Sequence, residues 1–299
     1  MTREQRATLA ILLSACAYGT LSIVTTVTSA VGVSLVALMA WRYTLAAPVL
    51  ALIAGGPRAL LRVPRRRATA LIVLGGGGQT LVTWLSLSSL EWIPAASLGF
   101  LFYTYPAWLT LLAAVTGMER LTWLRVSALT IALAGITLMV GTPWSAALPL
   151  PGVLRALGSA MVYAAYVPLL HKLRGPLDAP LASTFVILGA ALSFLVLAIS
   201  QGVLVTAMTP LTWGLAVLIA LLSTVVAFIS FLHGLGVLGP VRTAIISTLE
   251  PFWTAMLGAV LLSQSLGATT IAGGALIIAA IILLQRSSPT AIPDAPLPD

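Results

Sequence analysis

The chain has 299 residues, of which 60% are hydrophobic and only 7% are charged, with a formal net charge of +8. In a soluble protein roughly a quarter of the residues are charged, and these cover its surface. This composition therefore excludes a water-soluble globular protein. Residues 126–154 and 179–241 have no Asp, Glu, Lys or Arg. Because a helix needs about 20 apolar residues to cross the bilayer core, we predict an all-α polytopic membrane protein. A transmembrane barrel would instead show alternating segments of about ten residues.

Ten apolar segments, separated by Gly and Pro, fit ten transmembrane helices. We place them at residues 7–28, 33–54, 68–89, 94–116, 122–141, 152–171, 181–200, 211–232, 240–262 and 267–285. The first segment is longer than the apolar core of a signal peptide, which has about 7–15 residues, so we interpret it as a retained helix. The tail at residues 287–299 has no apolar periodicity, and we expect it to be disordered.

Positive charge gathers on one side of this topology. The basic residues on that side are Arg3, Arg6, Arg58, Arg62, Arg65, Arg66, Arg67, Arg120, Arg125, Lys172, Arg174, Arg242 and Arg286. Arg155 falls on the opposite side, and Arg42 lies within a segment. Because cytoplasmic loops carry an excess of Lys and Arg, we predict that both termini are cytoplasmic. The same bias accounts for the net charge, so we expect no nucleic-acid partner.

An offset of 145 residues superimposes the first half of the chain on the second. It places Tyr-Thr-Tyr-Pro-Ala-Trp at residues 103–108 on Thr-Leu-Glu-Pro-Phe-Trp at residues 248–253. Tyr18 falls on Tyr163 at the same offset. Isolated apolar matches mean little in this composition, but Tyr, Pro and Trp matching at one offset indicate an internal repeat.

Each repeat has five segments, so the two copies insert into the membrane in opposite senses. The arginine-rich loop around residues 58–67 accordingly corresponds to a charge-free loop at residues 201–210. We therefore predict two inverted five-helix repeats, at residues 1–141 and 152–286. Inverted repeats are a transporter architecture, with the substrate site near the midplane where the halves meet.

Three short motifs occur in order along this repeat. They are Arg42-Tyr43, Glu119-Arg120-Leu121 and Leu249-Glu250-Pro251. Together with the ten segments they resemble the EamA-type branch of the drug/metabolite transporter superfamily, over about residues 7–286. The aromatic-rich centre is similar to bacterial exporters of amino acids, aromatic ones included, which implies a bacterial inner membrane. The second repeat departs from the family pattern, because Ser263-Gln264-Ser265 stands where Glu-Arg is usual and Ile187 stands in the place of Arg42.

Two ionisable residues lie at mid-membrane depth. Glu250 is about ten residues, or roughly 15 Å, into the ninth segment. Pro251 removes a backbone donor there, so freed carbonyls and a carboxylate would suit an ammonium group. The alternative is a protonated Glu250 that only ties helices together; we favour function because intramembrane charge is costly. Arg42 could receive a carboxylate, but we favour an ion pair or a cap on exposed carbonyls, and the sequence does not decide whether it pairs with Glu250.

The other candidates for substrate binding are aromatic and polar residues in the middle of segments. They are Tyr18, Gln79, Thr83, Trp84, Tyr103, Tyr105, Trp108, Tyr163, Thr248 and Trp253. Tyr and Trp normally collect at the membrane interfaces, and a buried hydroxyl needs a partner or a wet cavity. Packing is the alternative for each ring, and we assign Pro106 and Pro251 to structure or coupling. We expect the repeat mates Tyr18 and Tyr163 to face each other.

We predict a transporter that exports amino acids, or similar small amphipathic metabolites, by alternating access. Its cavity would be lined mainly by segments one, three, four, six, eight and nine. A nucleotide-sugar or sugar-phosphate carrier, and a multidrug or cationic-compound exporter, are the alternatives. Histidines and acids are scattered, with His171 and His233 far apart, so we expect no enzyme, no cofactor and no metal site. The expected partners are the substrate and the lipid bilayer, and we expect a monomer.

Overall fold

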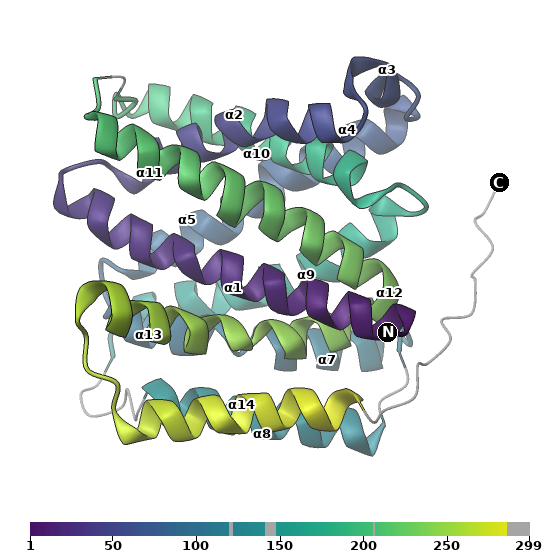
Figure 1. The fold of residues 1–299 in the computed structure, drawn as a ribbon, viewed down its shortest axis with the longest axis vertical. Coiled ribbons are helices and arrows are strands. Elements are labelled where there is room, and N and C mark those ends of the chain that lie inside the picture. The colour runs from purple at the N-terminus through teal and green to yellow at the C-terminus, as the bar shows by residue number, and fades with distance from the viewer. Residues whose placement is uncertain (120–121, 141–147, 206, 286–299) are drawn as a thin grey trace.

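The computed structural model describes residues 1–119, 122–140, 148–205 and 207–285, with the side chains of Ala95 and Ala96 left aside. The expected disordered tail at residues 287–299 lies outside the described residues. The described chain is built from helices (Figure 1). This confirms the prediction of an all-α polytopic membrane protein, because within the described ranges nine helices are long and apolar enough to span a bilayer and one shorter apolar helix accompanies them.

The helices follow the ten expected segments in order. They are α1 Arg3–Ala30, α2 Leu35–Ile53, α3 Gly56–Leu61, α4 Arg65–Val73, η1 Leu74–Gln79, α5 Thr80–Ser89, α6 Ala95–Phe102, α7 Tyr105–Val115, α8 Trp123–Val140, α9 Leu150–Arg174, α10 Ala179–Ser200, α11 Pro210–Ala220, η3 Leu221–Val226, α12 Ala227–Ser247, α13 Leu249–Leu262 and α14 Ala268–Gln285. The short helix α3 lies between the second and third expected segments and was not predicted. The third, fourth, eighth and ninth spans each consist of more than one helical piece.

Helix packing repeats with pseudo-two-fold symmetry. The second and seventh spans, α2 and α10, pack together, and so do the fifth and tenth, α8 and α14. The first span, α1, contacts α12 and α13, while its repeat mate α9 contacts α5 and α7. Figure 1 shows α2 with α10 along one lateral side of the bundle, α8 with α14 along the opposite lateral side, and α1 and α9 between them. Helices at equivalent positions of the two sequence repeats therefore make equivalent packing contacts.

The fourth and ninth spans break at equivalent positions. In the fourth, α6 ends at Phe102 and α7 begins at Tyr105. In the ninth, α12 ends at Ser247 and α13 begins at Leu249. Each break comes just before a repeat proline, because proline has no N–H and its ring disfavours a continuous helix.

The third and eighth spans each contain a π-helical turn, η1 and η3. η1 is made of Leu-Gly-Gly-Gly-Gly-Gln and packs against α10. A Cβ on Gly75 would overlap the backbone carbonyl of Val186, whereas Gly77 faces open space. Part of the glycine run is therefore required for close packing of the third span on the seventh.

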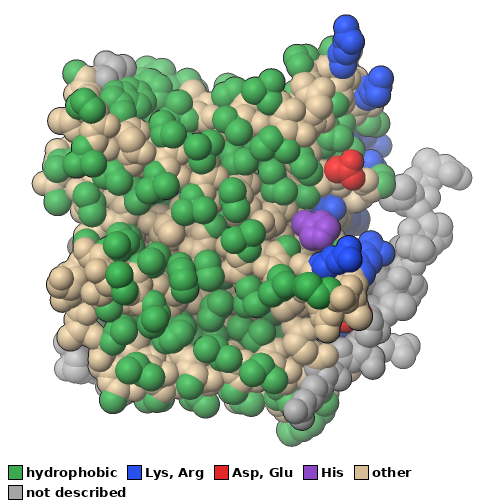
Figure 2. All heavy atoms as spheres, in the orientation of Figure 1, with side chains coloured by type: hydrophobic (Ala, Val, Ile, Leu, Met, Phe, Trp, Pro, Cys, Tyr) green, Lys and Arg blue, Asp and Glu red, His purple; other side chains and the backbone are tan. Residues whose placement is uncertain are grey.

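Charge separates the two ends of the bundle. In Figure 2 the visible Lys and Arg side chains gather along one edge, and Figure 1 places the N-terminus there. The end of α14 lies beside the start of α1, because Gln285 Nε2 donates to Thr8 Oγ1 over 2.9 Å. We assign this basic end to the cytoplasm by the positive-inside rule.

Gly75→Ala tests the close packing of η1 on α10. We expect it to lower the thermal unfolding midpoint in detergent, because the added methyl meets backbone, which cannot move aside as a side chain can. Gly77→Ala is the matched control and should be neutral or stabilising by up to about 1 kcal/mol, since Ala favours helix over Gly. Equal midpoints for the two variants would contradict the packing described here.

Candidate functional site

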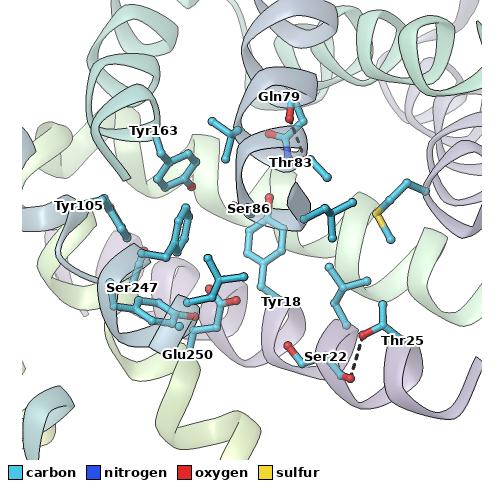
Figure 3. A pocket seen from close by; sticks show the side chains of 18 of the residues that line it. Tyr18, Ser22, Thr25, Gln79, Thr83, Ser86, Tyr105, Tyr163, Ser247 and Glu250 are labelled. Atoms are coloured by element: carbon cyan, nitrogen blue, oxygen red, sulfur yellow. Dashed lines mark hydrogen bonds between the residues drawn. The ribbon is translucent and has the colours of Figure 1, made fainter. Parts of the chain in front are cut away.

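A cavity of about 390 Å³ opens between the two repeats, a volume within the usual range for small-molecule sites. Its walls come from α1, α2, η1 with α5, α6 with α7, α9, α12 and α13. The expected spans all contribute, and the second span joins them through Leu35, Met39, Arg42 and Tyr43. Figure 3 shows the cavity with its labelled polar side chains.

The structure brings most of the predicted substrate-binding residues together. Those that line the cavity are Tyr18, Gln79, Thr83, Tyr103, Tyr105, Tyr163 and Glu250. In Figure 3, Tyr18 and Tyr163 approach the cavity from different helices, with Glu250 below them and Gln79 above. Residues from both repeats thus share one space.

Four predicted residues do not line the cavity. Trp84 is 54% exposed on the outside of the bundle, because it follows Thr83 and a helix turns by about 100° per residue. Trp108 donates its indole N–H to Thr104 Oγ1 over 3.1 Å. Trp253 packs beside Gly19 of α1, and Thr248 is buried at the helix break.

At each helix break a threonine hydroxyl forms a hydrogen bond with a backbone carbonyl of the preceding turn. Thr104 Oγ1 donates to the Leu101 carbonyl over 2.6 Å, and Thr248 Oγ1 donates to the Ile245 carbonyl over 2.6 Å. These carbonyls therefore already have hydrogen-bond partners. Among the groups that the ninth-span break brings to the cavity, the Glu250 carboxylate is the one with a charge to offer to a cation.

Glu250 lies in the first turn of α13 and meets the other repeat at Tyr103. The Tyr103 and Glu250 side chains line the same cavity and interact electrostatically. The Tyr105 hydroxyl donates to the Ala244 carbonyl of α12 over 3.4 Å, across the same boundary. The broken spans of the two repeats are thus joined by polar contacts at the wall of the cavity.

Aromatic rings form one wall of the cavity. The Tyr105 and Tyr163 rings meet edge to face at 4.8 Å between centroids, and the Tyr163 and Tyr166 rings stack at 5.9 Å. Phe102 lies 5.5 Å from Tyr163 and 5.7 Å from Tyr105. Rings in such a cluster can hold an apolar side chain and offer π-faces to a cation.

Hydroxyl and amide groups line other parts of the cavity. Gln79, Thr83 and Ser86 lie along one face of the third span, and Ser22 and Thr25 along one face of the first. Sequence reasoning did not select Ser22, Thr25 and Ser86. Their helical spacing from Tyr18 and from Gln79, by four and then three residues, is the signal that could have found them.

Sequence reasoning also missed Tyr43 and Ser247, which line the cavity. Tyr43 is 2% exposed and its ring stacks with Phe194 at 5.4 Å. Ser247 comes one turn before Glu250 and so shares its face. Tyr43 follows Arg42 in a motif already singled out, but nothing in the sequence showed that the second span reaches the cavity.

Arg42 is bound to the π-helical turn of the eighth span. Its Nε donates to Thr224 Oγ1 over 2.6 Å and its Nη2 donates to the Ser223 carbonyl over 2.6 Å. The guanidinium also lies 4.9 Å from the Tyr43 ring centroid. Arg42 and Glu250 both line the cavity, but among the ion pairs of the described residues none joins them. Of the two structural roles considered for Arg42, the cap on an exposed carbonyl is the one its contacts support.

The cavity lies in the half of the membrane away from the basic end. α1 starts at the cytoplasmic end, and its lining residues, from Tyr18 to Thr25, come from its second half. α2 runs in the opposite direction, and its lining residues, from Leu35 to Tyr43, come from its first half. The cavity therefore extends from mid-membrane towards the outer side.

Comparison with known proteins identifies the family. Residues 5–141 and 150–286 each match the EamA-like transporter family. The chain belongs to this family. It is therefore a membrane transporter of the drug/metabolite superfamily and not an enzyme. A solved structure described only as "Crystal structure of protein" shares the fold, with a TM-score of 0.73, 23% identity and coverage of 93% of this chain and 96% of that chain. No curated protein matches the chain.

A buried ion pair and a half-buried one connect helices at the basic end of the transporter. Arg125 and Glu119 pair over 2.6 Å with side chains only 2% and 5% exposed. Glu119 Oε1 also accepts the Val241 N–H over 3.4 Å, just after the kink at Gly239, where φ is 77°. Arg242 pairs with Glu4 of α1 over 3.3 Å. Burial raises the pKa of Glu119 above its ordinary value, and the Arg125 guanidinium opposes that shift.

Glu119→Gln tests the buried pair. The substitution removes the carboxylate that neutralises buried Arg125, and breaking a buried pair costs about 3–5 kcal/mol. We expect a clear fall in the thermal unfolding midpoint of the purified transporter. Glu91→Gln is the matched control, because Glu91 is 71% exposed in its pair with Arg155 and exposed pairs contribute about 1 kcal/mol or less. Equal effects of the two variants would contradict a buried pair.

Proposed function

We propose that the transporter exports amino acids, neutral and aromatic ones among them, or similar small amphipathic metabolites, by alternating access. The observation that carries this proposal is the Glu250 carboxylate beside Tyr103 in a cavity with an aromatic wall. Glu250 would hold the substrate ammonium, and the rings would hold its side chain. Gln79 and Ser86 would donate to its carboxylate, as an amide and a hydroxyl can, while Thr83 already donates its hydroxyl hydrogen to the Gln79 backbone carbonyl over 2.9 Å.

The cavity has one cation, which disfavours a phosphorylated substrate. Arg42 is the basic residue among the described lining residues, and its Nε and Nη2 are bonded to the eighth span. A phosphate binds best to several cations or to a bidentate guanidinium that is free to receive it. A sugar-phosphate or nucleotide-sugar carrier therefore fits this site less well than an amino-acid carrier does.

A cationic-compound exporter is the alternative that the site supports next. A carboxylate among aromatic faces also suits a cation without a carboxylate of its own. The hydroxyl and amide row on η1 and α5 favours a zwitterion, because it gives the second charged group its partners. Both substrate classes would bind Glu250 through their cation. Only the zwitterion would also need the hydroxyl and amide groups on η1 and α5.

Export by one chain in a bacterial inner membrane completes the proposal. The cavity is lined by both repeats of the chain, so we propose a monomer as the transporting unit. The outward direction rests on the similarity of the aromatic-rich centre to amino-acid exporters. In the transport cycle, the contacts around Glu119 would open to admit substrate from the cytoplasm while the outer half of the cavity closes.

Counterflow in proteoliposomes tests the substrate class. We expect labelled phenylalanine or another neutral amino acid to exchange, and a sugar phosphate to exchange no faster than in empty vesicles. Glu250→Gln should raise the half-saturating concentration of the amino acid by about ten-fold or more, the loss expected for a hydrogen bond to a charged group. It should change the inhibition by phenylpropionate, which lacks the ammonium group, much less.

Glu91→Gln serves as the control, because Glu91 lies outside the cavity. Absence of flux for every amino acid would refute the proposed substrate class. If Glu250→Gln weakened phenylalanine and phenylpropionate binding equally, Glu250 would not bind the ammonium group.

A further inference from the structure

A second cavity lies on the membrane-facing surface of the bundle, away from the transport site. It has a volume of about 390 Å³ and is lined by α2, α3 and α10. Its walls are almost wholly aliphatic; Ala47, Ala51, Leu60, Leu188 and Leu192 are among the lining residues. Among the described lining residues, Thr44 and Thr184 carry the hydroxyl groups, and Thr184 donates its own to the Pro180 carbonyl, so the groove suits a hydrocarbon chain better than a polar solute.

The groove lies mainly in the cytoplasmic half of the membrane. α2 descends towards the basic end, and its lining residues, from Thr44 to Ala51, come from its second half. α10 starts at that end, and its lining residues run from Thr184, close to its start, to Leu195, beyond its midpoint, so the groove reaches from the cytoplasmic half to mid-membrane. The occupant therefore belongs to the cytoplasmic leaflet.

Two exposed arginines lie on and just after α3, the helix that contributes Leu60 to the groove. They are Arg58 and Arg62, which flank Leu60 in the sequence. Among the ion pairs of the described residues, none involves Arg58 or Arg62. Figure 2 shows basic side chains projecting at the corner of the molecule where Figure 1 places α3. The positive-inside rule explains why arginines occur on this side, but it does not require an apolar groove beside them.

We propose that this groove binds one acyl chain of an anionic phospholipid of the cytoplasmic leaflet, whose phosphate is held by Arg58 and Arg62. Basic pockets between membrane helices on the cytoplasmic side are suited to anionic head groups, and guanidinium is the best cation for a phosphate. A zwitterionic lipid would place its own cation among these arginines and bind less well. The lipid would brace α3 and α10 against α2 on the side of the bundle opposite α8 and α14.

Native mass spectrometry of the purified transporter tests this. The probes are phosphatidylglycerol and phosphatidylcholine with identical acyl chains, titrated separately. We expect one phosphatidylglycerol to bind about 25-fold more tightly than phosphatidylcholine, because each of the two arginines contributes about five-fold near an anionic group. Arg58→Gln with Arg62→Gln should abolish that preference. Arg3→Gln with Arg6→Gln, which removes the same charge from the same membrane face, should leave it intact.

A second pair of variants tests the groove itself. Ala51→Phe fills the cavity and should reduce retention of both lipids, whereas Leu52→Phe changes the neighbouring residue, which is 74% exposed and does not line the groove, and should not. Equal binding of the two lipids by the wild-type chain would overturn the proposal, as would a preference that survives loss of Arg58 and Arg62. A lipid-free dimer that Ala51→Phe dissociates would show instead that a second copy occupies the groove.

Discussion

Hydrocarbon offers no hydrogen bonds, so a membrane protein must satisfy every interruption of a helix from its own groups. This constraint governs the centre of the transporter, where the fourth and ninth spans break and the third and eighth contain π-helical turns. Thr104 and Thr248 bond the carbonyls at the two breaks, and Arg42 bonds a carbonyl of the eighth span. With these groups satisfied, the Glu250 carboxylate faces the cavity together with other polar side chains, Gln79, Ser22 and Ser86 among them.

The scaffold is symmetric, whereas the chemistry is not. Both repeats place a proline after the break, but the residue before that proline is Tyr105 in one and Glu250 in the other. The ends of the bundle differ in the same way. Glu119 pairs with Arg125 at the cytoplasmic end, and its repeat equivalent at the outer end is the uncharged Gln264. An ion pair at the inner end and a cavity that reaches the outer half accompany this difference in charge.

The sequence was sufficient for features that depend on composition and repetition. Hydropathy located the spans, and the 145-residue offset located the repeat with its prolines Pro106 and Pro251, beside which the structure has the helix breaks. It was insufficient where packing decides. The direction that Trp84 faces depends on the rotation of the third span about its axis, which apolar residues on all sides do not fix. The contact of Arg42 with Ser223 joins residues of different repeats, and no local pattern predicts such a pair.

The π-helical turns are a further reason why the faces predicted from the sequence differ from those in the structure. A π-helical turn shifts the helical phase of the residues that follow it, so faces extrapolated through Gly75–Gly78 are displaced. Within the uninterrupted α5 the spacing of Thr83 and Ser86 is helical, and both residues reach the cavity. The helical spacing thus groups Thr83 with Ser86 within α5, but it does not fix which way the span faces.

The central claim is that a cavity between the repeats, open to the outer side, holds the substrate at Glu250. Cysteine accessibility tests it most directly. In a Cys16→Ala background, Ser22→Cys and Ser86→Cys are labelled with a membrane-impermeant thiol reagent applied to one side at a time. We predict labelling from the outer side that phenylalanine slows, and loss of this protection when Glu250 is replaced by Gln. Labelling of both positions only from the cytoplasmic side, or no protection by any amino acid, would contradict the account.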